Sequence, residues 1–202
     1  MRMGWVLGWA IPQSWFAPLV EQAFRGEDHV YFDAGLWTCS EIAKSGPFDW
    51  LAGYSLGSLL LLDGYRAVAA KRVALLAPIF AFSIEEKLGG RVPRSQVRYL
   101  ARWLRRDPGA AIADFSSRAG LDLPALKDVP IGPLEWGLGL LESTRIEPSM
   151  PEGWRAFCGD RDPLLDAARL HELVPEVTIV AGATHHPLEL LHAFRKSPLT
   201  YE

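Results

Sequence analysis

Short apolar runs alternate with segments of helical spacing along most of the chain. The runs that we interpret as strands are apolar throughout, which is typical of strands covered on both faces. The predicted strands are Gly4–Leu7, His29–Phe32, Trp50–Gly53, Val73–Ala77, Trp154–Cys158 and Val177–Ala181. The predicted helices are Trp15–Phe24, Leu56–Ala70, Leu164–Leu173 and Leu188–Phe194. This alternation predicts an α/β fold with a mostly parallel sheet of about six strands flanked by helices.

The stretch from residue 79 to residue 150 interrupts this alternation. It has no convincing strand pattern, and prolines divide it into short helical segments. These prolines are Pro93, Pro108, Pro124, Pro130 and Pro133. We therefore expect residues 1–78 and 151–202 to form one core, with residues 79–150 inserted as a helical lid.

Composition limits the functional classes. The 202 residues are 49% hydrophobic with a net charge of −3, which suits one folded domain and gives no overall basic charge for nucleic acid. Cys39 and Cys158 offer neither a disulfide framework nor a zinc pattern, so we expect a reducing, cytoplasmic location. No apolar run approaches the roughly 20 residues that span a bilayer. The apolar segment Gly4–Ile11 is broken at Pro12, so we expect a strand there and no signal peptide.

Residues 53–57 read Gly-Tyr-Ser-Leu-Gly and match the G-x-S-x-G pattern. An apolar strand pattern runs into this segment and an apolar helix pattern follows it, as a nucleophile elbow requires. In such an elbow the serine is exposed at the carboxyl edge of the sheet. The segment predicts Ser55 as a nucleophile; the alternative is an ordinary small-residue turn between a strand and a helix.

A serine nucleophile needs a base, and the base needs an acid that orients it. With an elbow of this kind, the acid and then the histidine follow the serine along the chain. Asp162 follows the strand that ends at Cys158, and we favour it as the acid over Asp160. His185 follows the last predicted strand, and we favour it as the base over its neighbour His186. We discount a metal site at this histidine pair, because no third ligand is suitably spaced.

Two backbone N–H groups must stabilise the oxyanion that forms during attack on a carbonyl. One belongs to the residue after the nucleophile, which is Leu56. The other comes from the loop after an early strand, which predicts Trp9.

These segments resemble the α/β-hydrolase superfamily over nearly the whole chain. The resemblance is closest to the pimeloyl-[acyl-carrier protein] methyl ester esterases of biotin synthesis. The segments that carry it are residues 7–10 with Trp15, 53–57, 133–141, 159–162 and 183–187. The resemblance implies a minimal α/β-hydrolase fold and a triad of Ser55, His185 and Asp162. It also implies oxyanion donors at Trp9 and Leu56, and no metal or organic cofactor.

The chain departs from the family pattern in two places. The early loop of the family usually reads His-Gly, whereas Leu7 precedes Gly8 here. The two usual edge strands before this loop are also missing, which leaves the minimal sheet of about six strands.

Six arginines and no acidic residue occur between residues 91 and 106. They are Arg91, Arg94, Arg98, Arg102, Arg105 and Arg106. On one helix they would fall within an arc of about 120°. Like charges at this spacing repel one another, so we expect an acidic group to offset them. That group is the protein's own acidic surface, a substrate carboxylate or an acidic partner such as acyl-carrier protein. Trp136 is placed where it could line an apolar substrate channel, although core packing is the ordinary role of such a residue.

The sequence thus predicts a monomeric serine esterase. Its expected reaction is hydrolysis of the methyl ester of pimeloyl-[acyl-carrier protein], with no nucleic-acid or membrane partner. A small-molecule carboxylesterase or thioesterase with the same triad is the alternative. A lyase of menaquinone synthesis and a non-catalytic binding protein on the same scaffold are further alternatives.

Overall fold

The computed structural model describes residues 1–64, 70, 72–125 and 130–198. Its centre is one six-stranded sheet in the order β2-β1-β3-β4-β5-β6, and every neighbouring pair is parallel. The strands are β1 (Arg2–Val6), β2 (Asp28–Phe32), β3 (Trp50–Tyr54), β4 (Val73–Leu76), β5 (Arg155–Gly159) and β6 (Val177–Val180). All six predicted strands are confirmed, with ends that shift by one or two residues.

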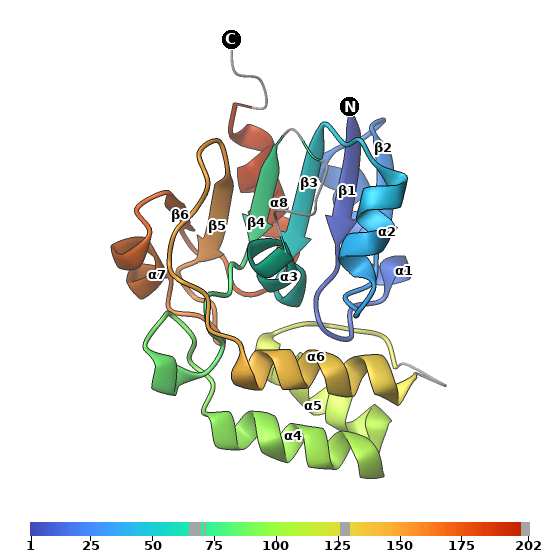
Figure 1. Ribbon diagram of the computed structural model, residues 1–202, viewed down its shortest axis with the longest axis vertical. Coiled ribbons are helices and arrows are strands. Elements are labelled where there is room, and N and C mark those ends of the chain that lie inside the picture. The colour runs from blue at the N-terminus through green and yellow to red at the C-terminus, as the bar shows by residue number, and fades with distance from the viewer. Residues whose placement is uncertain (65–69, 71, 126–129, 199–202) are drawn as a thin grey trace.

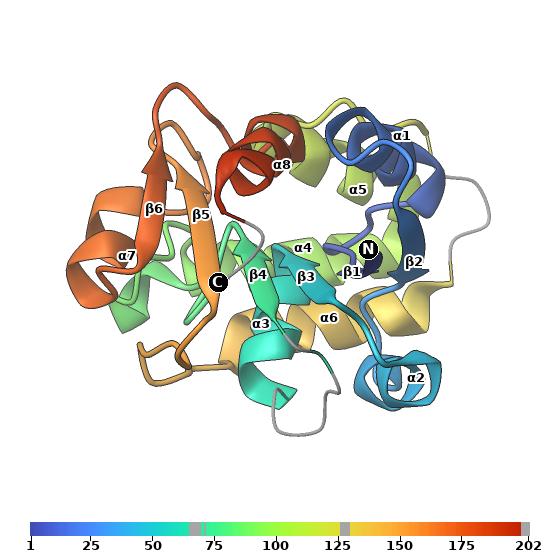
Figure 2. The same cartoon turned by 90° about the horizontal axis from the view of Figure 1, so that it is seen from above.

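Helices cover both faces of the sheet, which explains why the strands are apolar on both sides. Helices α1 (Gln13–Ala23) and α8 (Pro187–Lys196) lie on one face, and α2 (Thr38–Ser45) and α3 (Leu56–Gly64) lie on the other (Figure 2). Helix α7 (Ala167–Leu173) packs beside β6. Under α1 and α8 the rings of Trp5, Phe16, Phe24 and Phe194 form a buried aromatic cluster.

The predicted helices differ from the observed ones in three places. The helix predicted over 56–70 is observed to Gly64; residues 65–69 lie outside the described part, and Ala70 forms an isolated β-bridge with Phe48 instead. The helix predicted from Leu164 begins at Ala167, where the side chain of Asp166 caps it by accepting from the backbone N–H of Arg169. Helix α2 was not predicted, since its short sequence is mostly polar and buries little.

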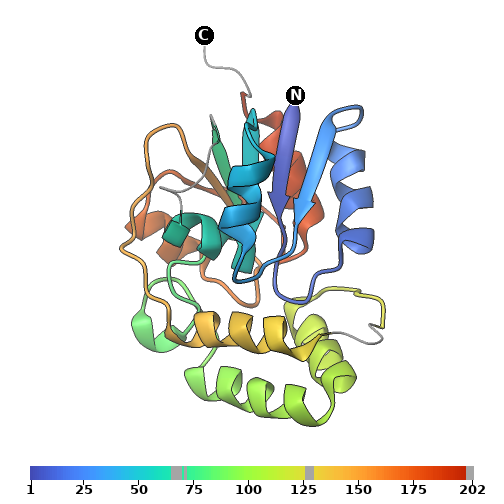
Figure 3. The ribbon, with the colours of Figure 1, turned by 45° about the vertical axis from the view of Figure 1, so that its right-hand side comes forward.

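Three helices lie between β4 and β5 and form a layer across the carboxyl ends of the strands (Figures 1 and 3). They are α4 (Arg94–Arg106), α5 (Pro108–Ala119) and α6 (Ile131–Ser143), preceded by the short 3₁₀ helix η2 (Ile84–Glu86). The prolines mark their starts: Pro93 and Pro130 immediately precede α4 and α6, and Pro108 is the first residue of α5. Within the described residues of 79–150, no strand joins the sheet.

Candidate active site

Ser55 lies in a sharp turn between β3 and α3, at the carboxyl edge of the sheet. Its φ is 54°, in the left-handed region that a non-glycine residue adopts only under constraint. The two glycines of the motif make room for this turn. A Cβ on Gly57 would come within 2.2 Å of the Val6 carbonyl oxygen, and one on Gly53 within 2.6 Å of the Gly57 carbonyl oxygen. The close approach of α3 to β1 and β3 therefore requires glycine at both positions.

Ser55, His185 and Asp162 form one continuous chain of polar contacts. The Nε2 atom of His185 lies 3.1 Å from Ser55 Oγ, and its Nδ1 atom lies 2.7 Å from Asp162 Oδ2. With Nδ1 protonated, His185 donates to Asp162 and accepts from the Ser55 hydroxyl. The three residues come from the loops after β3, β5 and β6. Asp162 is fully buried, whereas Ser55 retains 7% exposure. Solvent therefore reaches these three side chains chiefly at Ser55.

The two alternative residues have other partners. The carboxylate of Asp160 accepts a hydrogen bond from the backbone N–H of Gly182 at 2.7 Å, which shapes the turn after β6. His186 caps α8, because its Nδ1 accepts from the backbone N–H of Leu188. Its ring packs edge-on against Trp15. The geometry therefore brings Asp162 and His185 to Ser55, in preference to their neighbours.

The loop after β5 carries Asp162, and we call it the acid loop. Hydrogen bonds hold it from both sides. Asp162 Oδ1 accepts from the backbone N–H groups of Leu164 and Leu165, at 2.8 and 3.0 Å. The carbonyl oxygen of Asp162 accepts from Nη1 of Arg91 at 2.9 Å. Arg91 also donates its backbone N–H to the Leu164 carbonyl, and its guanidinium lies 3.7 Å from the Asp166 carboxylate. These bonds leave Oδ2 of Asp162 directed at the histidine.

Tyr54 supports the histidine loop, a role that the sequence analysis missed. Its phenol donates to the carbonyl oxygen of His185 at 2.8 Å, and its ring stacks on Phe16. Burial, followed by the nearby Asp162 charge, raises the pKa of Tyr54 well above its ordinary value. The phenol therefore stays protonated and keeps its donor. The position of Tyr54 inside the serine motif is the one signal that could have indicated this role.

The two predicted oxyanion residues lie beside the elbow and under α6. Leu56 is the first residue of α3, and Trp9 lies in the turn after β1. Within the part of the chain that the structure describes, the backbone N–H of neither residue donates to a protein acceptor. The Trp9 indole donates to the Leu134 carbonyl at 2.9 Å. A Cβ on Gly137 of α6 would come within 2.9 Å of both Trp9 and Leu56 side chains. Helix α6 thus closes directly over this pair.

The arginines of the predicted lid, residues 79–150, are largely offset by acidic residues of the protein itself. Arg94 pairs with Glu86, Arg105 pairs with Glu135, and Arg98 Nε lies 2.6 Å from Glu142 Oε1. Two of these acids belong to α6. Arg91 precedes α4, because Pro93 prevents an earlier start; placing it on the same helix face was wrong. Arg102 and Arg106 are exposed on α4. The paired side chains of Arg98 and Arg105 remain 62% and 65% exposed, so they still face solvent.

A cavity of about 280 Å³ lies between the lid helices and the core. Phe82, Phe115 and Leu138 contribute to its apolar wall. Trp136, predicted for such a channel, does not line it and packs half-buried against the core.

Over residues 1–64, 70, 72–125 and 130–198, no cluster of three His, Cys, Asp or Glu side chains is arranged to hold a metal ion. In the same part of the chain, no helix combines the length and the apolar character needed to cross a bilayer.

Comparisons with known proteins bear on the fold. No protein-family model and no curated protein matches the chain in sequence. In structure it is similar to MGS-M2, an alpha/beta hydrolase enzyme from a Medee basin deep-sea metagenome library, at 12% identity and a TM-score of 0.59. That match covers 100% of this chain and 92% of the other. The RedJ thioesterase from the prodiginine biosynthetic pathway of Streptomyces coelicolor is similar at 15% identity and a TM-score of 0.55, covering 96% and 89%. BioG from Haemophilus influenzae is 14% identical with a TM-score of 0.47, covering 91% and 88%.

At these identities the likeness concerns the fold. The parallel strand order and the helices on both faces of the sheet agree with the fold predicted from the sequence. The chain has the α/β-hydrolase fold, in a minimal form with six parallel strands flanked by helices.

Proposed function

We propose that the protein is a serine hydrolase that cleaves carboxylic esters. The observation that carries this proposal is the continuous contact from Ser55 through His185 to the buried Asp162. A serine hydroxyl is a weak nucleophile until an adjacent base can take its proton. The buried carboxylate orients the imidazole and stabilises its charged form when it has taken that proton.

The first half of the reaction makes an acyl-enzyme. His185 Nε2 takes the Ser55 proton as Oγ bonds to the ester carbonyl carbon, and the carbonyl oxygen becomes an oxyanion. The backbone N–H groups of Trp9 and Leu56 donate to that oxyanion, and the N-terminus of α3 adds its positive dipole end. The bond to the alcohol oxygen then breaks, and this oxygen receives the proton from His185.

The second half releases the acid. His185 takes a proton from water, and the water oxygen attacks the acyl carbonyl carbon. The new tetrahedral intermediate then collapses: the bond from Ser55 Oγ to the acyl carbon breaks, and His185 returns the proton to Ser55 Oγ. Each half thus uses His185 once as a base and once as an acid.

For the substrate, we propose the methyl ester of pimeloyl-[acyl-carrier protein], with methanol as the leaving group. The resemblance of residues 7–10, 53–57 and 133–141 to the corresponding esterases supports this choice. Exposed lid arginines, Arg98, Arg102 and Arg105 among them, give an acidic carrier protein a surface to meet. Their internal acidic partners mean that docking would exchange existing ion pairs for new ones.

The second candidate is a small-molecule carboxylesterase or thioesterase with the same mechanism. The internal pairing of Arg94, Arg98 and Arg105 favours it, because these charges are already offset without a partner. The fold likeness to proteins described as an alpha/beta hydrolase and a thioesterase is equally compatible with it.

Parallel assays separate the two candidates. We expect the enzyme to hydrolyse pimeloyl-[acyl-carrier protein] methyl ester faster than p-nitrophenyl butyrate at matched concentrations. Cleavage of the p-nitrophenyl ester alone would leave the serine hydrolase in place and reject the carrier substrate. No cleavage of either ester would reject the esterase.

Paired charge reversals test the carrier surface. Arg98→Glu with Arg105→Glu should reduce kcat/KM on the carrier-bound ester by roughly tenfold or more at low salt, with a smaller difference at high salt. The matched control is Arg25→Glu with Arg195→Glu, which reverses two arginines far from the lid. Equal effects of both pairs on the carrier-bound ester would reject docking on α4.

A further inference from the structure

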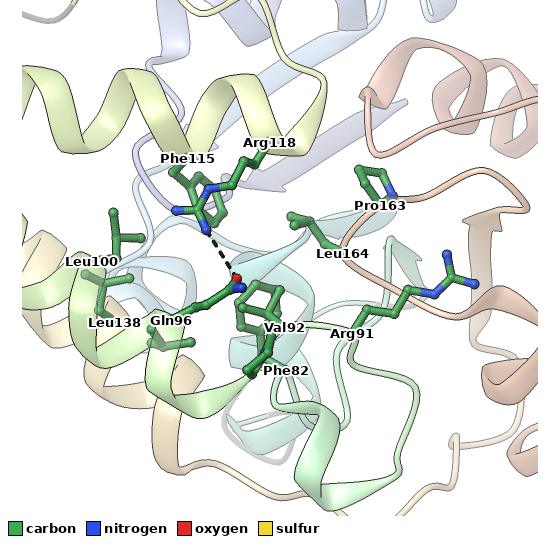
Figure 4. A pocket seen from close by; sticks show the side chains of 12 residues that line it. Phe82, Arg91, Val92, Gln96, Leu100, Phe115, Arg118, Leu138, Pro163 and Leu164 are labelled. Carbon is green, nitrogen blue, oxygen red and sulfur yellow. Dashed lines mark hydrogen bonds between the residues drawn. The ribbon is translucent and has the colours of Figure 1, made fainter.

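The cavity beneath the lid is apolar over most of its wall, and one polar contact joins two of its lining side chains. Residues of α4, α5 and α6 line it together with the segment before α4 and the acid loop (Figure 4). At about 280 Å³ it lies near the lower limit for small-molecule pockets, which suits a slender chain better than a bulky ring system.

The polar contact joins Gln96 of α4 to Arg118 of α5. Arg118 Nη1 donates to Gln96 Oε1 at 3.3 Å, across the cavity as drawn in Figure 4. The same two residues line a second, more open hollow of about 370 Å³, together with Tyr99, Trp103 and Asp114. The Gln96–Arg118 pair therefore lies where the inner cavity meets the outer hollow.

Arg91 also lines the cavity, but its charge is used elsewhere. Its guanidinium donates to the Asp162 carbonyl and lies beside Asp166, and Figure 4 shows it directed away from Arg118 and Gln96. The guanidinium of Arg118 is the cationic group at the junction. Its partner Asp114 is four residues earlier on the same helix, and both side chains are more than a third exposed. Such an exposed ion pair contributes little to stability, so an anionic ligand can displace the Asp114 carboxylate from Arg118.

One side of the cavity lies against the loop that carries Asp162. Pro163 and Leu164, which line it, directly follow Asp162 in the chain. Phe115 also lines it, and its ring packs edge-on against Trp9 with centroids 4.9 Å apart. An acyl chain in this cavity would thus lie between Pro163 and Leu164, which follow Asp162, and Arg118 at the junction with the outer hollow.

We propose that Arg118 determines substrate specificity by binding an anionic group at the far end of the acyl chain. This inference rests on the proposed esterase function and adds a substrate class to it. The substrate is an ester with a slender acyl chain. That chain either ends in a carboxylate or is extended by a group that carries a phosphate. Arg118 binds that group with charge-assisted hydrogen bonds, and the apolar wall contacts the methylenes.

Two matched esters test this class. Monomethyl pimelate and methyl heptanoate have acyl chains of the same length, and they differ in the terminal carboxylate. We expect the wild-type enzyme to prefer monomethyl pimelate, and Arg118→Gln to lower the ratio of the two kcat/KM values roughly tenfold or more. Arg145→Gln is the control, because Arg145 is a lid arginine that also faces an acid, Glu86, at 3.5 Å. An unchanged ratio in Arg118→Gln would overturn the proposal for a terminal carboxylate.

A carrier-bound ester distinguishes the source of the anion. Pimeloyl-[acyl-carrier protein] methyl ester has no free terminal carboxylate but has the phosphate of its prosthetic arm. A selective loss on this ester in Arg118→Gln would assign the phosphate, and a selective loss on monomethyl pimelate would assign the carboxylate. Equal changes on both esters and on methyl heptanoate would reject anion recognition by Arg118.

A binding measurement keeps this inference separate from the esterase proposal. Calorimetry with Ser55→Ala measures monomethyl pimelate binding without turnover. We expect Ser55→Ala/Arg118→Gln to bind it roughly tenfold or more weakly. If the wild type cleaves no ester while this difference in binding is found, the esterase proposal fails and the anion site stands. If the esters are cleaved, and neither this difference in binding nor a selective loss on the carrier-bound ester is found, the site assignment fails alone.

Discussion

The phenol of Tyr54 donates a hydrogen bond to the carbonyl oxygen of His185, 2.8 Å away and 131 residues later in the chain. Tyr54 is also the residue immediately before Ser55. One side chain therefore ties the loop of the proposed base to the turn of the proposed nucleophile. The distance from Ser55 Oγ to His185 Nε2 depends on this tie as well as on the histidine rotamer.

Tyr54→Phe removes this tie with little change in shape. The variant leaves a buried carbonyl without its donor, which should lower the free energy of unfolding by about 1–3 kcal/mol. We expect kcat on p-nitrophenyl butyrate to fall by roughly tenfold with KM nearly unchanged, because ester binding does not involve the phenol. Tyr99→Phe at an exposed position is the control. Wild-type kcat in Tyr54→Phe would show that the phenol does not position the base.

The raised pKa of Tyr54 also predicts a pH dependence of stability. In the unfolded chain tyrosine ionises near pH 10. In the folded protein burial, followed by the Asp162 charge, keeps the phenol protonated well above that pH. Ionisation thus favours the unfolded state as pH rises above about 10. The free energy of unfolding should fall there by up to about 1.4 kcal/mol per pH unit from this residue.

Tyr54→Phe should remove that part of the slope, measured by urea denaturation between pH 9 and 11. Tyr31, whose pKa is raised to about 12 by burial and then by Glu21, contributes in the same direction and remains in both proteins. Identical slopes for wild type and variant would contradict the burial of a neutral phenol at Tyr54.

Gly57 is expected to tolerate no side chain. The Cβ of Gly57→Ala would lie 2.2 Å from the Val6 carbonyl oxygen, so α3 would have to move away from β1. We expect a loss of at least about 3 kcal/mol in unfolding free energy and of nearly all esterase activity. Gly139→Ala on α6 is the matched control, because its Cβ would meet no neighbouring atom within 4 Å outside the helix's own backbone. That change should raise helix stability by about 0.5–1 kcal/mol. Similar stability of the two variants would refute the packing constraint.

Arg91 is expected to act on the reaction through the acid loop. Arg91→Gln should weaken the bond to the Asp162 carbonyl and let Asp162 drift from His185. We expect kcat to fall by roughly threefold to tenfold, since one charge-assisted hydrogen bond is lost. Arg169→Gln is the control: Arg169 also donates to a backbone carbonyl, that of Lys87, and pairs with an acid. Equal kcat values in the two variants would mean that Arg91 does not position Asp162.

The sequence predicted the sheet, and the three polar residues proposed for the site lie together at its carboxyl edge, for a common physical reason. Strands covered on both faces can be recognised as short continuous runs of apolar residues. Their carboxyl ends meet at one edge of a parallel sheet. Ser55, Asp162 and His185 each follow such a strand, so local pattern placed them near one another. The choice of Asp162 over Asp160 agrees with the geometry because Asp160 is used by the Gly182 turn.

The contacts that support the site were not readable in this way. The bond of Tyr54 to His185 and that of Arg91 to Asp162 each join segments more than 70 residues apart, and no local pattern indicates such pairs. The lid arginines were read as one helix face with six like charges. Pro93 excludes Arg91 from that helix, and acids on α6 and η2 offset three of the others. Charge pairing between helices depends on tertiary packing that one-dimensional periodicity does not contain.

The most direct test of the account is covalent labelling with a fluorophosphonate, which reacts with a serine only when a base has activated it. The wild-type protein should be labelled at Ser55, as located by mass spectrometry of the digested peptide. Ser55→Ala should not be labelled, and His185→Ala should be labelled at least about a hundredfold more slowly. Absence of label on the folded wild-type protein, or label on another serine, would contradict Ser55 as the nucleophile.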